Sequence, residues 1–429
     1  MVISLTILGL LIFLLGSTIW VGMSLIIIGI ISIMFFTSSP PLGILNNILW
    51  KETNSSVMMT LPLFIFMGEL LYRSKISENL FNGLAPWLTF LPGRLVHVNI
   101  ASSSLFAAVS GSSAATTATV GKITLPELLR RDYDRSLSIG MLAGAGTLGF
   151  LIPPSMMMIV YGIAANVSIG QLFMAGIIPG ALLVVGFMGY TIIRSVINPE
   201  LAPSAEAYTW GDRIRALPLL LPIIILISLV LGSIYFGWAT PTEAASIGVF
   251  GSIIIAVVTR SLTMKAFWEA VLGAVKTNAM IMLIVLGASY LSVAIGYLGI
   301  PAKLTSFIST LGLSGYALIA ILAVMYILLG ALLDGFSMIV MSLPLALPLI
   351  VAAGFDPLWF GIFLVIMIEI SQITPPIGFN LFVINGLVKD DIIQIARYAI
   401  PSFIIILIVA AIITIYPEVV LWLPSVMIK

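Results

Sequence analysis

The chain has 429 residues, of which 61% are hydrophobic and 8% charged, with a net charge of +1 and no cysteine. A soluble fold cannot bury so large an apolar fraction, so the composition predicts an all-α polytopic membrane protein. The lack of cysteine excludes disulfides, thiolate metal sites and cysteine catalysis, and the single histidine, His97, excludes two-histidine metal motifs. The N-terminal apolar segment lacks a basic region, so we interpret it as the first membrane span rather than a cleaved signal peptide.

Apolar runs bounded by polar residues, proline or glycine predict ten membrane crossings. They cover 2–16, 19–36, 56–72, 138–163, 172–193, 217–236, 243–259, 274–298, 358–385 and 399–424. Two further apolar regions, 97–128 and 316–353, are too long for one crossing and are interrupted midway by small and polar residues. Each of these two regions therefore predicts a re-entrant helical hairpin.

The basic residues of the loops set the orientation of these spans. Most of them fall on one side of the predicted topology, which the positive-inside rule assigns to the cytoplasm. The first hairpin then opens from the cytoplasm, the second opens from the periplasm, and the N-terminus is periplasmic. The residues that set this orientation are Arg94, the run at 130–135, Arg194, Arg213, Arg215, Arg260 and Lys265.

An internal repeat relates the two halves of the chain with an offset of 222 residues, the distance from 153 to 375. Prolines recur three times at this offset: Pro153-Pro154 as Pro375-Pro376, Pro126 as Pro348, and Pro179 as Pro401. Each half contains five crossings and one hairpin, and because five is odd, the second half is inverted. We predict a first inverted repeat at 1–193, a cytoplasmic linker at 194–216 and a second repeat at 217–429. Inverted-topology repeats are typical of secondary transporters.

Each half is interrupted twice, once in the hairpin and once at its Pro-Pro helix. Broken helices expose backbone carbonyls that bind ions near the membrane midplane. A sodium ion prefers about five or six oxygen ligands from carbonyls, hydroxyls and carboxylates. We therefore predict one Na⁺ at each pair of breaks, at least two ions in all. The candidate ligands are Ser110, Gly111, Ser112, Ser113, Thr147, Gly149 and Pro153 at the first pair, and Asp334, Gly335, Ser337, Ser371, Gln372 and Thr374 at the second.

The substrate is expected between the two ion sites, near the hairpin tips, where helix N-termini favour anionic groups. The candidate contacts are Ser113, Thr116, Lys122, Ser155 and Asn380.

Several residue assignments stay open at this point. The small residues of the first hairpin also suit plain helix packing, Asp334 could pair with a buried lysine, and Lys122 could snorkel to the membrane surface. Glu369 could line the cavity, carry a proton or satisfy backbone groups. His97, near Arg94, suits an interfacial position.

Two moderately amphipathic segments, 75–94 and 299–315, occupy corresponding places in the two halves. Amphipathic helices of this kind lie in the membrane interface. We predict that they are arms joining a fixed scaffold to a moving hairpin domain.

The hairpin tips and the Pro-Pro segments also carry a family resemblance. They read "AAVSGSSAATTATVG" at 107–121, "GTLGFLIPPS" at 146–155, "GALLDGFSM" at 330–338 and "EISQITPPIGFN" at 369–380. Over nearly the whole chain the sequence closely resembles the large membrane subunit of tripartite ATP-independent periplasmic (TRAP) transporters. The resemblance implies a sodium-driven importer of organic acids, with no enzyme activity, that works by an elevator movement in the bacterial inner membrane.

The resemblance also implies substrates and partners. The substrates would be C4-dicarboxylates, sialic acids or other sugar acids, and the sequence does not discriminate among them. The partners would be a small four-helix membrane subunit, here a separate chain, and a periplasmic protein that binds and delivers the solute. The family's sodium sites fall on the two pairs of breaks, with Asp334 in the second.

Two other functions are weighed against this one. A related ion-coupled anion transporter would need no binding protein. An intramembrane serine hydrolase would use a serine of "SGSSA" (110–114) as nucleophile and His97 as base, although His97 is expected at the membrane border. No G-x-x-x-x-G-K-[ST] motif is present, so ATP is not the direct energy source.

Overall fold

The computed structural model describes residues 6–427 except 8, 11, 12, 15, 16, 18, 204–207, 311, 332 and 377. Helices and turns make up this part of the chain, and it contains no strand, which confirms the predicted all-α class. The predicted span at 2–16 lies partly outside the described residues.

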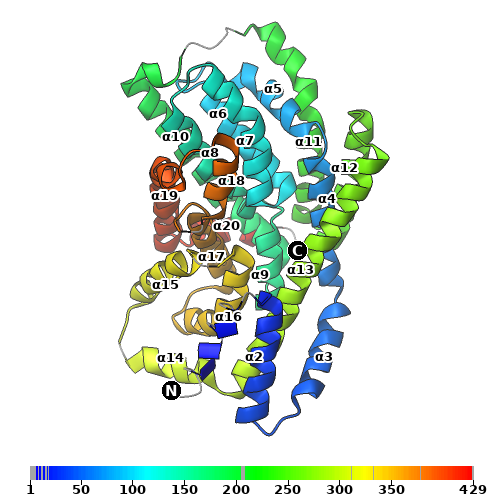
Figure 1. Cartoon of the computed structure of the whole chain (residues 1–429), viewed down its shortest axis with the longest axis vertical. Helices are drawn as coiled ribbons and strands as arrows, with labels where there is room; N and C mark the ends of the chain where they lie inside the picture. Colours follow the sequence, from blue (N-terminus) through cyan, green and yellow to red (C-terminus); the bar gives the residue numbers. More distant parts are fainter. Residues whose placement is uncertain are drawn as a thin grey trace.

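The helices follow one another with short connections (Figure 1). In chain order they are α2 (Val21–Phe36), α3 (Pro41–Thr53), α4 (Thr60–Tyr72), α5 (Ile76–Leu88), α6 (Leu95–Ser110), α7 (Ser113–Arg130), α8 (Arg135–Thr147), α9 (Met156–Ala165), α10 (Ile169–Ile197), α11 (Trp210–Tyr235), α12 (Pro241–Val258), α13 (Met264–Tyr297), α14 (Ile300–Thr310), α15 (Gly315–Gly330), α16 (Gly335–Ala352), α17 (Pro357–Gln372), α18 (Phe379–Val388), α19 (Ile392–Ile415) and α20 (Glu418–Val426). Three short 3-10 turns are η1 (Ser56–Met59), η2 (Leu148–Phe150) and η3 (Pro199–Leu201).

Six of the described helices are long and apolar enough to cross a membrane alone: α10, α11, α12, α13, α16 and α19. A seventh candidate is the pair formed by α3 with the segment 57–72, which bends by 65°. Five of these helices, α10–α13 and α19, lie in predicted crossings, whereas α16 belongs to the predicted second hairpin. Among the other predicted crossings, each Pro-Pro span is divided into shorter helices, and α2 and α4 are shorter than 18 residues.

Three element boundaries differ from the predicted ones. The predicted crossing at 399–424 is two helices, because α19 ends at Ile415 and α20 begins at Glu418, after Pro417. The predicted linker at 194–216 is shorter, since α10 continues to Ile197 and α11 begins at Trp210. The helix α3 lies in a segment for which no helix was predicted.

Capping side chains explain where the helices of the second half begin. Thr209 and Asp212 form a capping box at the start of α11, and Thr240 and Glu243 form another at the start of α12. In each box the two side chains bind each other's backbone N–H, which satisfies donors that the helix leaves free.

The helices pack as two groups. In one group, α13 packs along α2 and α4, and α12 packs against α4 and α11 (Figure 1). In the other, α6, α7 and α8 pack with one another, α10 packs against α6, α8 and α9, and α17 packs against α9, α15, α16 and α19. Side chains such as Leu221, Ile225 and Leu229 on α11 and Phe250 and Ile254 on α12 remain exposed. Such exposed apolar rows are what a lipid-facing surface requires.

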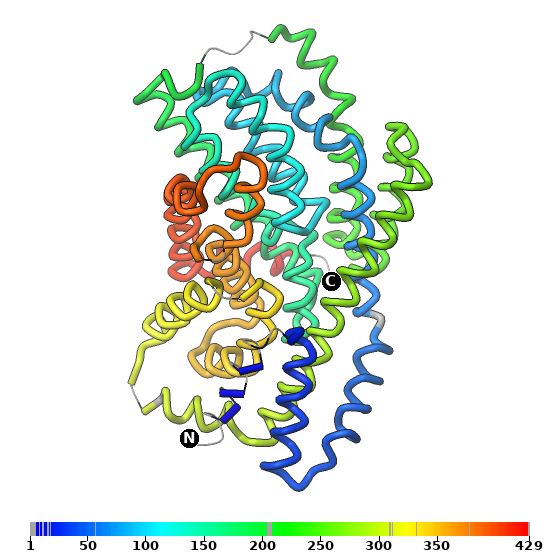
Figure 2. The backbone as a smooth tube through the Cα atoms, in the orientation of Figure 1, coloured from blue at the N-terminus to red at the C-terminus, as the bar shows by residue number. Residues whose placement is uncertain are grey.

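The predicted hairpins are helix pairs that double back on themselves (Figure 2). They are α6 with α7 and α15 with α16. At the first tip Gly111 closes α6 in the left-handed conformation, with φ +58°. The predicted Pro-Pro helices are α8–η2–α9 and α17–α18, and both are interrupted at the predicted prolines. Both Pro-Pro peptide bonds are cis.

Candidate functional site

The tip of the first hairpin is a compact group of hydroxyls. Ser110 Oγ lies 2.8 Å from Thr116 Oγ1, and Thr116 Oγ1 donates to the carbonyl oxygen of Ser112 at 2.8 Å. Ser112 Oγ accepts the Ala115 N–H at 3.4 Å, which caps α7. The tip is therefore ordered by its own side chains, and its hydroxyl and carbonyl oxygens are gathered within one turn.

This tip packs directly on the first Pro-Pro break. The N–H of Met156 donates to Gly111 O at 3.5 Å. A Cβ on Gly111 would lie 2.9 Å from Pro154 O, and one on Gly149 would lie 2.6 Å from Ser112 O. Only glycine allows these close approaches. The structure thus brings the predicted ligands at 110–113 together with those around 149–153.

The prolines of the first break change which carbonyls are available. Pro153 has no N–H to bond Gly149 O, and Pro154 has none to bond Phe150 O. Ser155 Oγ donates to Phe150 O and also accepts the Met158 N–H at 3.4 Å, which caps α9. The remaining predicted ligand, Thr147, is fully buried and donates to Gly144 O at 2.8 Å.

Asp334 is the N-cap of α16 at the tip of the second hairpin. Its Oδ2 accepts the N–H groups of Phe336 at 3.0 Å and Ser337 at 3.2 Å, and Ser337 Oγ donates to its Oδ1. Among the described residues Asp334 has no ion pair, so the alternative pairing with a buried lysine is not found. Its side chain is exposed.

The second hairpin packs on the second break. A Cβ on Gly330 would overlap the Ser371 side chain, and one on Gly335 would lie 2.6 Å from Ile368 Cγ2. Ser371 Oγ donates to Ile368 O and Thr374 Oγ1 donates to Ile370 O, both at 2.7 Å. The side chain of Gln372 is buried, 5% exposed, and Pro376 has no N–H for the Gln372 carbonyl.

The two pairs of breaks differ in exposure. Pro153 and Pro154 are buried, whereas Pro375, Pro376 and Asp334 are exposed. The first pair is therefore enclosed by protein, and the second pair is open on one side.

The two pairs are joined at the predicted substrate position. Ser113 Oγ, at the start of α7, donates to Asn380 Oδ1 on α18 at 3.0 Å, and both residues are fully buried. Within the described part of the chain, the Nδ2 group of Asn380 has no hydrogen-bond partner. Thr116 and Ser155 lie at the first tip and first break. Lys122 does not join them, because it is exposed and lies about 13 Å further along α7.

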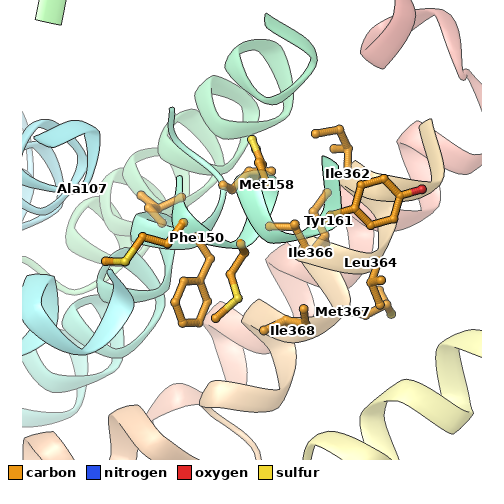
Figure 3. Packing of buried hydrophobic residues seen from close by; sticks show 14 of the residues in the cluster. Ala107, Phe150, Met158, Tyr161, Ile362, Leu364, Ile366, Met367 and Ile368 are labelled. Carbon is orange, nitrogen blue, oxygen red and sulfur yellow. The ribbon is translucent and has the colours of Figure 1, made fainter. Parts of the chain in front are cut away.

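Apolar side chains couple the first break to α17. Figure 3 shows Phe150, Met158 and Tyr161 packed among residues of α17 that include Ile362 and Ile366. The Tyr161 hydroxyl donates to Pro357 O at 2.6 Å, so the end of α9 is fastened to the start of α17. The first broken helix is therefore packed on and hydrogen-bonded to α17 of the second.

Among the described residues, two buried polar groups near these sites have no hydrogen-bond partner. Both carboxylate oxygens of Glu369, which is fully buried in α17, lack a hydrogen bond. The hydroxyl of Thr117 also lacks one and lies against Gly146. Thr117 was not among the predicted site residues, although it belongs to the polar run at 110–117 that marks the hairpin tip.

A serine nucleophile with His97 as base does not form. His97 is fully buried within the protein, and its Nε2 lies 2.6 Å from Pro92 O. Ser110 lies at the other end of α6, about 20 Å away along the helix. The two side chains are therefore far outside hydrogen-bond reach of each other.

Residues 8–419 match the family model described as "Tripartite ATP-independent periplasmic transporter, DctM component". The chain belongs to this family. Its TRAP relatives are named as transporter permeases, so the chain is a transporter component and not an enzyme.

Two relatives show how far this TRAP similarity extends. The isethionate TRAP transporter permease protein DctMQ of Oleidesulfovibrio alaskensis is 32% identical over 390 residues, which cover 89% of this chain and 60% of that longer protein. The C4-dicarboxylate TRAP transporter large permease protein DctM of Pseudomonas aeruginosa is 30% identical over 378 residues, 88% of each chain.

A solved structure has a similar fold. The crystal structure of the Alcanivorax borkumensis YdaH transporter superposes with a TM-score of 0.65 over 89% of this chain and 87% of that one. The sequence identity is 13%, so this likeness concerns the TRAP chain's fold alone.

Proposed function

We propose that this chain is the permease of a sodium-coupled TRAP importer for a small organic anion. The observation that carries the proposal is the pair of hairpin tips packed on two Pro-Pro breaks, joined by the buried Ser113–Asn380 hydrogen bond. Substrates of the C4-dicarboxylate, sulfonate or sugar-acid type fit a site lined by hydroxyl and amide groups. Relatives named for isethionate and C4-dicarboxylates support this class.

The proposed sodium sites use oxygens that the breaks make available. At the first pair these are the carbonyls of Gly111, Ser112 and Gly149 with the hydroxyls of the tip. At the second pair they are Gln372 O with the carboxylate of Asp334. Carbonyls, hydroxyls and a carboxylate form a donor set that fits a hard cation such as Na⁺.

The proposed mechanism is an elevator movement built on two inverted repeats, 1–193 and 217–429. The group of α2, α4 and α11–α13 would be the scaffold, and the hairpins with their broken helices would be the moving domain. The amphipathic helices α5 and α14 would be the arms. A cavity of about 690 Å³ between α13 of the first group and α9 and α16 of the second supports a sliding boundary there.

Sodium would supply the driving force. Each positive charge that enters down the membrane potential contributes about 2.3 kcal/mol per 100 mV. Two Na⁺ with one monoanion would therefore make import electrogenic.

The proposed complex includes a separate small membrane subunit and a periplasmic binding protein. This chain would lie in the inner membrane with its N-terminus in the periplasm.

Solute uptake into proteoliposomes that contain both partners tests the proposed function. We expect uptake only with an inward sodium gradient and with the binding protein present. Equal uptake without sodium would refute the coupling, and equal uptake without the binding protein would favour the binding-protein-independent transporter.

A further inference from the structure

A second cavity lies far from the hairpin tips, where α5, α10 and α11 meet at one end of the molecule (top of Figure 1). Its volume is about 600 Å³. The residues that matter among its lining are Phe90, Arg94, Ser195, Tyr208 and Arg213. The cavity therefore joins the amphipathic α5, the loop that leads into the first hairpin, and the connection between the two halves of the chain.

The cavity is positively charged. It is lined by the guanidinium groups of Arg94 and Arg213, and none of the described residues lining it is Asp or Glu. Arg94 uses one Nη1–H for Pro203 O at 3.0 Å, and Arg213 uses its Nε–H for Pro86 O at 3.1 Å. A guanidinium has five N–H donors, so each arginine is held in place by a backbone carbonyl and keeps most of its donors for a ligand.

Ser195 supplies an independent sign of a ligand. It lines the cavity, is 6% exposed, and its Oγ has no hydrogen-bond partner among the residues that the structure describes. A buried hydroxyl without a partner is unfavourable in a folded protein. An anion held by the two arginines would provide the missing acceptor.

Exposed aromatic rings stand beside the arginines. Phe90 is 67% exposed and Trp210 is 69% exposed. The guanidinium carbon of Arg213 lies 5.8 Å from the centre of the Phe90 ring and 4.7 Å from that of Trp210. Aromatic rings with neighbouring cations are typical of the headgroup level of a membrane. The opening of this cavity is therefore suited to the boundary between lipid and water.

We propose that this cavity binds the phosphate group of an anionic phospholipid. The planar fork of arginine matches phosphate oxygens, and basic pockets between helices at a membrane surface suit lipid headgroups. Free inorganic phosphate shares this chemistry, but it would not use the exposed rings of Phe90 and Trp210. The bound lipid would tie the arm α5 to the loop before α6, so it would tune the link between scaffold and hairpin. The binding site itself does not depend on sodium coupling.

Lipid binding to the full-length chain in nanodiscs of phosphatidylcholine tests the proposal. The probe is dioctanoyl phosphatidylglycerol. Its binding is measured by the shift in the thermal unfolding temperature of the protein and by native mass spectrometry. We expect saturable binding that Arg213→Gln and Arg94→Gln each weaken about tenfold, because a charged hydrogen bond is lost. The matched control is Arg215→Gln on the same helix, which removes an exposed arginine outside the cavity and should leave binding unchanged.

Two further variants separate binding from folding. Ser195→Ala removes a hydroxyl that has no hydrogen-bond partner among the described residues. It should therefore leave the unfolding temperature of the lipid-free protein unchanged and weaken lipid binding a few-fold. Arg213→Lys keeps the charge and should retain part of the affinity. Wild-type affinity in both Arg213→Gln and Ser195→Ala would overturn the proposal. So would inorganic phosphate that competes fully with the lipid at equal concentration, because the ligand would then be a soluble anion.

Discussion

At the scale of single residues, the site depends on glycines that let backbones touch. Gly149 brings the first break against Ser112 O, and Gly111 brings the hairpin tip against Pro154 O. The hydroxyls nearby mostly bond to backbone carbonyls of their own turn, such as Thr147 to Gly144 and Ser371 to Ile368. The close approach of two backbones, rather than any one side chain, therefore brings the oxygens together.

Gly149→Ala tests this close approach. The added Cβ would lie 2.6 Å from Ser112 O, so the hairpin tip must shift. We expect a loss of about 1–3 kcal/mol in stability and loss of sodium-dependent uptake, measured by thermal unfolding and in proteoliposomes. Gly189→Ala is the control, because its Cβ would meet nothing within 4 Å and helix propensity favours alanine. Normal uptake by Gly149→Ala would contradict the packing argument.

Asp334 has two separable roles, as cap of α16 and as proposed ligand. Asp334→Asn keeps a side chain that caps helices well but removes the negative charge. We expect it to fold normally and to need about tenfold more sodium for half-maximal uptake, the effect of about 1.4 kcal/mol of lost attraction. Asp356→Asn, which changes the equivalent cap of α17, should leave sodium dependence unchanged. Wild-type sodium dependence in Asp334→Asn would remove this residue from the ion site.

At the scale of elements, the sequence predicted the breaks better than the helix ends. Prolines mark the breaks because the missing N–H acts locally, whatever packs around it. The division at Pro417 was missed because a single proline within an apolar segment can kink one helix as well as separate two. The Ser113–Asn380 contact could not be derived from the sequence either, because 267 residues separate the two. Only the packing of α7 on α18 brings them together.

One ion pair joins the two halves at the ends of their broken helices. Arg135, at the start of α8, donates from Nε to Asp390 Oδ2 at 2.8 Å and from Nη2 to Oδ1 at 2.6 Å. Asp390 lies in the turn between α18 and α19, outside the predicted membrane spans. These hydrogen bonds hold the pKa of Asp390 below its usual value.

The ion pair predicts a pH dependence of stability. The pKa of Asp390 is lower in the folded protein than in the unfolded chain. The ion pair therefore stabilises the fold fully above the usual Asp pKa of about 3.9, and this stabilisation is lost as the pH falls below that value. For a partly exposed pair we expect about 1 kcal/mol or less. Thermal unfolding measured between neutral pH and pH 3 should show this acid-dependent loss of stability in the wild type. The loss should be absent from Arg135→Gln and from Asp390→Asn. Additive effects in the double variant would show that the two side chains do not act as a pair.

At the scale of the whole molecule, the proposed elevator mechanism requires the two packing groups to move relative to each other. Their boundary includes the cavity of about 690 Å³, whose walls hold Ser289 and Ser292 of α13 and Leu347 of α16. The cavity leaves part of this boundary unfilled by side chains, although α13 and α16 contact each other beside it. A boundary of this kind can slide at lower cost than a close-packed core, in which displaced side chains lose their contacts.

Cross-linking across this boundary tests the movement directly. The chain contains no cysteine, so a cross-linker can react only with the cysteine pairs that are introduced. We expect that a flexible, reducible thiol cross-linker joining Ser292→Cys to Leu347→Cys stops uptake, and that reduction restores it, because α13 and α16 can no longer separate. The matched control is the pair Ser289→Cys and Ser292→Cys, where both residues lie in the same cavity wall on one rigid helix. Cross-linking that control should leave uptake intact. Full uptake by the cross-linked α13–α16 pair would show that these two helices move as one body, and the scaffold would then have to be sought elsewhere in the chain.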